Sequence, residues 1–202
     1  MAVATGGTAV GEVPALKEWG AVAHALLAGR QCLLLRKGGI HERRFVVGAP
    51  RPVLFPTVAH SHAEDVRPEH HDLLAPGAAD STDERVVVRC ALAVRAVVPV
   101  ERPEHLDELA PLHVWTTASA ARRLDFRPRH LLTALVVEAR PLLVPVEVAR
   151  RPEHRGCSSW LDLAADLPGR PALGPPALDD AALAEAGRRV RSAVGGPGDA
   201  DR

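Results

Sequence analysis

The sequence predicts an α+β protein with a mainly antiparallel or mixed sheet, short flanking helices and a C-terminal helical tail. Two long stretches, 85–98 and 131–148, have the composition of strands, and the first of them alternates apolar with charged or small residues. Shorter stretches carry apolar residues at helical spacing. No regular strand–helix–strand rhythm is present, so we expect a mainly antiparallel sheet rather than a parallel one.

The first element expected is a helix between Pro14 and Gly29. Apolar residues from Leu16 to Leu27 recur at three- and four-residue spacing. Proline suits the first turn of a helix and glycine suits its end. Residues 1–12 are small and lack periodicity, so we expect a flexible N-terminus.

Two short strands are expected next. Cys32–Leu35 is too short for a helix and predicts a buried strand, and Val53–Phe55 has strand composition. Pro50 and Pro52 lack the N–H group of a sheet ladder, so we expect this second strand at an edge or in a turn.

The middle of the chain alternates polar loops with short helices. We expect a histidine-rich acidic loop with one short helix near 68–74, a strand over 85–98 and a helix over 102–109. Thr116 or Thr117 can cap a further helix over 118–124.

In the last third, the strand region 131–148 should bend or split at Pro141 and Pro145. A Pro- and Gly-rich linker leads to a helix capped by Asp179 or Asp180. The predicted domain organisation is a flexible segment (1–12), an α+β domain (13–167), and a linker with a terminal helix (168–202).

Charge is balanced overall but unevenly distributed. With 25 basic and 25 acidic residues, the net charge of zero excludes indiscriminate polyanion binding by the whole surface. Residues 30–52 hold six cations against one acid, a net charge of +5, and residues 62–84 hold seven acids against one cation, a net charge of −6. These two segments either pair with each other or leave a local basic face.

The three cysteines, Cys32, Cys90 and Cys157, have no metal-ligand or redox spacing, and we expect the first two as buried thiols. No charged-then-apolar leader is present, and no apolar run approaches membrane-spanning length. We therefore expect a cytoplasmic protein without membrane contact.

The strongest candidate site follows the first predicted strand. Arg36 and Lys37 lead directly into Gly38 and Gly39. Glycine permits backbone conformations that other residues avoid, so backbone amides and cationic side chains can converge there on one anion.

Five segments taken together resemble the bacterial family catalogued as domain of unknown function 1802. They are Leu16-Lys17-Glu18-Trp19, the stretch 33–40, Phe55-Pro56-Thr57 with His60, Leu112-His113-Val114-Trp115-Thr116, and Gly156-Cys157-Ser158-Ser159-Trp160. This family has no established activity. Its members occur beside Mrr-type restriction endonuclease domains, which implies a link to restriction or DNA defence and a possible endonuclease partner. The chain departs from the family pattern at Val58 and Ser61.

A second, weaker likeness concerns residues 29–36. They fit in outline the Gly-x-Lys-x-x-Glu-x-Arg signature of ASCH domains, which are PUA-like nucleic-acid or nucleotide binders. Gln31 stands in place of the lysine and Leu34 in place of the glutamate.

Three further groups of residues have the composition of a chemical site. The histidine-rich acidic loop could bind a divalent ion through His60 and His62, although a convincing metal site needs three or four fixed ligands. Its other candidate ligands are His70, His71, Glu64 and Asp65, and His41 with Glu42 could add to them. Glu138-Ala139-Arg140 is the nearest match to a nuclease strand, but arginine does not simply replace lysine there. Ser158 and Ser159 lack the surroundings of a nucleophile elbow and are expected in a capping turn. We therefore assign no metal, cofactor or catalytic residue.

A second cationic group lies C-terminal to Trp115 and consists of Arg122, Arg123, Arg127, Arg129 and His130. If it lies beside Arg36 and Lys37, the two groups would form one basic groove, and arginine forks suit phosphate. Trp115 is expected mainly as a core residue.

The functional hypothesis is a non-catalytic nucleic-acid-binding module. In it Arg36 and Lys37 hold phosphate, Gly38 and Gly39 permit close approach, and His60, His113 and Trp115 contact a base. Two alternatives stay open: a metal-dependent phosphodiesterase or nuclease, and a protein-interaction adaptor that docks through its terminal helix.

Overall fold

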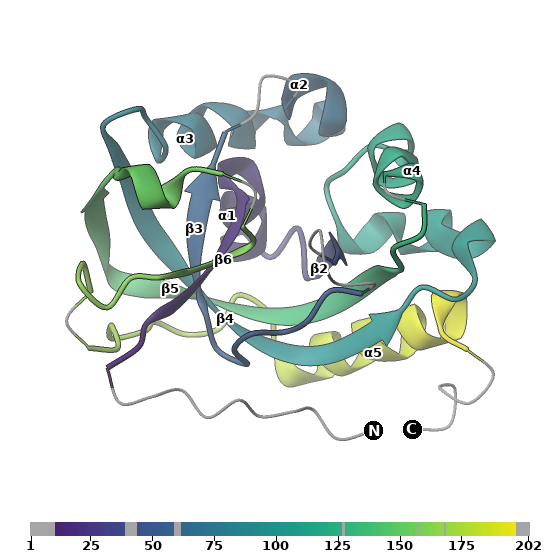
Figure 1. The fold of residues 1–202 in the computed structure, drawn as a ribbon. Helices are drawn as coiled ribbons and strands as arrows, with labels where there is room; N and C mark the ends of the chain where they lie inside the picture. The colour runs from purple at the N-terminus through teal and green to yellow at the C-terminus, as the bar shows by residue number, and fades with distance from the viewer. Residues whose placement is uncertain are drawn as a thin grey trace.

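The computed structural model describes residues 11–38, 44–58, 62–126, 128–156, 158–167 and 169–196. One six-stranded sheet dominates the fold, with strand order β2-β5-β4-β3-β1-β6 (Figure 1). The strands are β1 (Pro14–Trp19), β2 (Leu33–Lys37), β3 (Val53–Thr57), β4 (Arg85–Pro99), β5 (Leu132–Ala149) and β6 (Trp160–Asp162). Among these six described strands, β1 and β3 pair in parallel and the other pairs are antiparallel, so the mixed, mainly antiparallel α+β sheet expected from the sequence is confirmed.

Several short helices connect and cover these strands. The α-helices are α1 (Gly20–Leu27), α2 (His62–Asp65), α3 (Leu74–Ala79), α4 (Thr117–Asp125) and α5 (Asp180–Val194). The 3₁₀-helices are η1 (Pro68–Leu73), η2 (Pro103–Leu112) and η3 (Pro152–His154). The predicted cap of α4 is confirmed, because the Thr116 hydroxyl accepts a hydrogen bond from the Ser119 amide at 3.1 Å.

The prediction of a helix starting at Pro14 is wrong. Residues 14–19 form β1, which lies between β3 and β6, and the helix begins only at Gly20. The backbone hydrogen bonds of two neighbouring strands outweigh the helical spacing of the apolar residues here. The predicted end is correct, since Gly29 adopts a φ of 68° just after α1.

The prediction that Val53–Phe55 lies at an edge or in a turn is also wrong, because β3 is an interior strand between β4 and β1. The two prolines are accommodated through their carbonyl groups. The amides of Leu92 and Val94 donate to the carbonyls of Pro52 and Pro50 at 2.8 and 2.9 Å, so no proline N–H is required.

Strand β5 accommodates Pro141 and Pro145 through a shift in register. On its partner β4, Cys90 pairs with Pro141 but Val88 pairs with Val146, so β5 carries extra residues between these pairs. The predicted bend is therefore a register shift within one strand of 18 residues.

The sheet has an apolar core on each face. Alternate residues of β5 point to opposite faces: Leu135, Val137 and Ala139 pack with α1, whereas Leu132, Ala134 and Val136 pack with α5. Figure 1 shows α5 running along β4 and β5. The apolar side of α5 is thus buried in the protein core.

A candidate cationic cleft

A cleft of about 370 Å³ opens where β1 and β2 end and α4 passes over them. Its lining holds four cations and one acid from segments far apart in the sequence. They are Arg36 and Lys37 from β2, Arg122 and Arg123 from α4, and Asp65 from α2. The remaining lining residues include Trp19, Gly38, Ser119, Phe126 and Ser159. The predicted proximity of the two cationic groups is confirmed for these four side chains.

Arg36 is held by a buried carboxylate. Its Nη1 atom lies 3.1 Å from Oε2 of Glu18, and it also donates to the Lys17 carbonyl at 3.1 Å. The side chain of Glu18 is 3% exposed and that of Arg36 13% exposed. Since β1 and β2 are not neighbours in the sheet, this pair ties together the two strand ends that form the cleft floor.

The side chain of Lys37, at the end of β2, reaches the C-terminal end of α4. Its ammonium group donates to the carbonyl oxygens of Leu124 and Phe126, each at 2.5 Å. A cation is favoured there because the carbonyls of the last helical turn carry partial negative charge. Partial burial lowers the pKa of Lys37, and the nearby Asp125 carboxylate opposes that effect.

Arg123 lies over two tryptophan rings. Its guanidinium carbon is 4.3 Å from the ring centre of Trp115 and 5.2 Å from that of Trp19, which gives cation–π contacts to both. Its Nη1 atom donates weakly to the Leu35 carbonyl at 3.4 Å. Burial lowers the pKa of Arg123; the Glu18 carboxylate opposes this, and the guanidinium of Arg36 adds to it.

Arg122 is the most solvent-accessible of the arginines in the cleft. Its side chain is 60% exposed and forms an ion pair with Asp65, a carboxylate that is only 8% exposed. Counting Glu18 behind Arg36 and Asp125 beside Lys37, four cations stand against three carboxylates, so the region of the cleft keeps a net charge of +1. A local excess of positive charge in a concave surface attracts oxyanions.

His113 and Trp115 do not reach the surface. They are 2% and 1% exposed, and the ring of Trp115 packs edge-on against Trp19 at 4.5 Å between ring centres. Burial, together with the charges of Arg67 and Arg123, lowers the pKa of His113 to about 4. The expected contact of these two side chains with a base is therefore wrong, because both belong to the core. The ring of Trp115 lies beneath the Arg123 guanidinium and supports it.

The remaining predicted site residues lie partly in the cleft and partly outside the described part of the chain. Gly38 lines the cleft, whereas Gly39 and His60 lie outside the described residues. Of the other candidate metal ligands, His71 forms a hydrogen bond with the Val66 carbonyl and His70 contacts Arg67. Within the described ranges, no three His, Cys, Asp or Glu side chains are grouped closely enough to hold a metal ion.

The candidate catalytic residues make contacts outside the cleft. Glu138 accepts a hydrogen bond from Arg140 at 2.5 Å and pairs with Arg95, outside the cleft. The Ser158 hydroxyl bonds the Trp160 carbonyl at 2.8 Å, as expected of a turn. Cys157 lies outside the described residues.

Sequence reasoning missed Glu18, Trp19 and Asp65 as parts of this site. Glu18 and Trp19 were noted in a family motif, but the helix expected there hid their position at the end of a strand. Asp65 is expected from the sequence only as a candidate metal ligand in the acidic loop, not as the partner of Arg122. The basic segment 30–52 and the acidic segment 62–84 pair in part: Nη1 of Arg30 donates to both carboxylate oxygens of Asp72, each at 2.8 Å.

The fold and the cleft define a small α+β protein with a cationic groove at two strand ends. A family described as a domain of unknown function, DUF1802, matches residues 15–189. The chain therefore belongs to the DUF1802 family, as its five sequence motifs predicted. No protein of curated function matches the sequence.

Among solved structures, crystal structures of the ASCH protein from Zymomonas mobilis are similar to this chain. A Tyr-to-Phe variant of that protein is 14% identical, with 74% of this chain and 88% of that chain covered and a TM-score of 0.43. A Ser-to-Ala variant is 11% identical with coverage of 74% and 87% and a TM-score of 0.42. The structure without a stated substitution is 13% identical, with coverage of 69% and 88% and a TM-score of 0.36. At these TM-scores the likeness has no bearing on ligand or activity.

In the part of the chain that the structure describes, no helix is both long and apolar enough to cross a membrane.

Proposed function

We propose that this protein is a non-catalytic nucleic-acid-binding module whose cleft binds the phosphate backbone. The observation that carries the proposal is the convergence of four cations on one concave site with an excess of positive charge; they are Arg36, Lys37, Arg122 and Arg123. In a protein of zero net charge, such a local excess directs a polyanion to one place on the surface.

The four cations have different roles in this proposal. Arg122 is exposed and offers its guanidinium fork to a phosphate, with Asp65 holding its other side. Arg123 is fixed in position by Trp19 and Trp115 and supplies charge from the cleft wall. Arg36 and Lys37 were expected to hold the phosphate directly, but Glu18 and the carbonyls at the end of α4 already engage them, so in this proposal they contribute charge. Gly38 at the cleft permits close approach of a backbone, and Gly39 and His60 are proposed to extend the same site.

The proposal includes a cellular location and a partner. We place this role in the cytoplasm, and the family resemblance supports a link to restriction or DNA defence, with an endonuclease as partner. The adaptor alternative loses support because the apolar face of α5, including Leu183 and Val190, is buried against the sheet and η2.

The test is a salt series of fluorescence-anisotropy titrations with single- and double-stranded DNA and RNA of one length. About three phosphate contacts on a single strand give a slope of about −2 for the logarithm of affinity against the logarithm of salt concentration. Arg122→Gln should weaken binding to every sequence and reduce that slope by about 0.7.

Arg188→Gln is the matched control. Arg188 is 64% exposed and paired with Glu185, and Arg122 is 60% exposed and paired with Asp65, but Arg188 lies on α5 away from the cleft. Equal effects of the two variants, or no salt-dependent binding by the wild type, would refute the proposal. Cleavage of the probe only with an added divalent metal would favour the nuclease alternative.

A further inference from the structure

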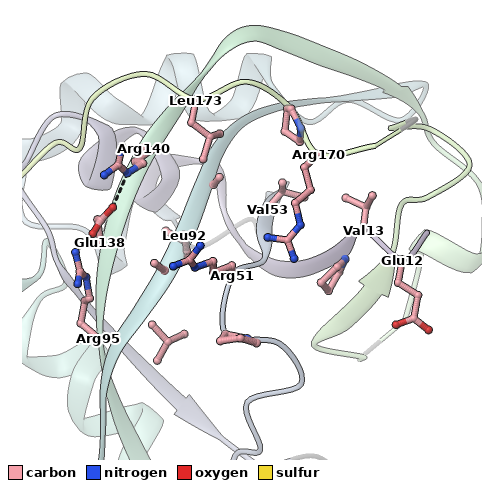
Figure 2. Close-up of a pocket in the computed structure, with 16 residues that line it drawn as sticks. Glu12, Val13, Arg51, Val53, Leu92, Arg95, Glu138, Arg140, Arg170 and Leu173 are labelled. Carbon is pink, nitrogen blue, oxygen red and sulfur yellow. Dashed lines mark hydrogen bonds and ion pairs between the residues drawn. The ribbon is translucent and has the colours of Figure 1, made fainter. Parts of the chain in front are cut away.

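A second, larger cavity of about 680 Å³ shares no lining residue with the cationic cleft. Five segments enclose it: the start of β1, the turn before β3, the middle of β4, the middle of β5, and the segment 170–173 (Figure 2). Val53, Leu92 and Leu173 give it apolar walls. Cavities of this size with apolar walls and a few convergent polar groups are typical of small-molecule sites.

The charged residues of this cavity are mostly arginines. Arg51, Arg95, Arg140 and Arg170 face two acids, Glu12 and Glu138, so the cavity has a net charge of +2. Figure 2 shows Glu138 beside Arg95 and Arg140 at one side of the cavity, and Glu12 at the other.

Glu138 is committed to two of the arginines. It is 5% exposed, accepts a hydrogen bond from Arg140 Nε at 2.5 Å and pairs with Arg95, which also contacts Asp180 at 2.7 Å. Burial opposes its ionisation, but the hydrogen bonds from Arg140 and Arg95 outweigh that effect and lower the pKa of Glu138. Glu138 is therefore an anion at neutral pH, already neutralised by its own partners.

Arg51 and Arg170 are in a different position. Within the described residues neither forms a hydrogen bond or an ion pair, and Figure 2 shows both side chains extending into the cavity. They come from segments more than a hundred residues apart in sequence, so only the fold brings them to one cavity. Two guanidinium groups that line one cavity without a carboxylate of their own leave positive charge there, which an oxyanion would neutralise.

We propose that this cavity binds a small molecule that carries a phosphate monoester, of about the size of a nucleoside monophosphate. Guanidinium forks match the geometry of phosphate oxygens, so Arg51 and Arg170 bind the phosphate. The apolar body of the ligand packs on Val53, Leu92 and Leu173. This site is independent of the phosphate-backbone cleft, because no residue is common to both.

The test is isothermal titration calorimetry of the full chain with the four ribonucleoside monophosphates, the four matching nucleosides and inorganic phosphate. We expect at least one monophosphate to bind with a stoichiometry of one, and to bind about tenfold or more tightly than its nucleoside, because the charge-assisted hydrogen bonds need the phosphate. The double variant Arg51→Gln/Arg170→Gln should lose at least about tenfold in affinity.

Both arginines are exposed, so the double variant should fold, and a thermal melt checks this. Arg122→Gln is the control that separates the two sites: it should weaken polymer binding and leave monophosphate binding unchanged. The proposal is overturned if no monophosphate binds, if the nucleosides bind equally well, or if the folded double variant binds like the wild type.

Discussion

Replacing Glu18 with glutamine should destabilise the protein and loosen the cationic cleft. Glutamine keeps the size of the side chain and one oxygen to accept the hydrogen bond from the Trp19 amide, which is 2.9 Å long in the wild type. The negative charge that neutralises Arg36 is lost. The guanidinium then remains in a site where it is 13% exposed without its counter-ion.

The expected size of the effect follows from this burial. Removing one partner of a buried ion pair costs about 3–5 kcal/mol, because the remaining charge is left uncompensated. Since Arg36 keeps its hydrogen bond to the Lys17 carbonyl, we expect the lower end, about 3 kcal/mol. In a chain of this size that corresponds to a fall in melting temperature of about 6–12 °C.

Urea denaturation followed by circular dichroism measures the change in the free energy of unfolding. A double-mutant cycle with Arg36→Met isolates the coupling: the double variant should be more stable than the sum of the two single losses implies. A loss below about 1 kcal/mol for Glu18→Gln, or simple additivity in the cycle, would show that the pair does not hold the strand ends together.

Two other predictions concern the core. Gly77→Ala should lower the free energy of unfolding by about 1–3 kcal/mol, because the new methyl group would lie 2.4 Å from the Ala21 amide nitrogen of α1. Gly187→Ala inside α5 is the contrast: its methyl group would meet only the Arg191 side chain, at 3.5 Å, and should stabilise the protein by up to about 1 kcal/mol. Equal melting temperatures of the two variants would contradict this prediction. The second concerns His113, whose pKa is about 4 when folded and about 6.5 when unfolded, so that the unfolded chain binds more protons between those values. The contribution of His113 to the free energy of unfolding should therefore fall by roughly 3 kcal/mol as the pH drops from 7 to 4. Urea titrations across this range should show a shallower fall in stability for His113→Gln than for the wild type. The same pH dependence in both proteins would show that His113 does not have this low pKa.

Much of the fold could be predicted from local patterns. The strand of residues 85–98, the capped helix after Thr116 and the C-terminal helix each carry a periodicity or a cap that lies within a few neighbouring residues. Prediction was wrong at residues 14–19, where local spacing indicates a helix but pairing with two strands prevails. The edge position predicted for β3 was also wrong. A proline is tolerated inside a sheet where the neighbouring strand bonds its carbonyl group and needs no N–H from it, and only the strand pairing shows this.

The candidate cleft could be predicted only in part. The cationic groups at Arg36 and at Arg122 are visible in the sequence, but their proximity in space could be stated only as a hypothesis. Trp115 also looked site-like, but side-chain burial depends on long-range packing, and its ring lies beneath Arg123 rather than at the surface.

The amino-acid sequence by itself determined which family the chain belongs to, its α+β class, and the two runs of positive charge, because these depend on residue identity and near-neighbour spacing. Only the tertiary structure decided that Arg36 faces Glu18, that Arg122 joins the same cleft, and that Arg51 and Arg170 share a cavity. The physical reason is that the curl and register of the sheet bring distant segments together, and no spacing along the chain records that geometry.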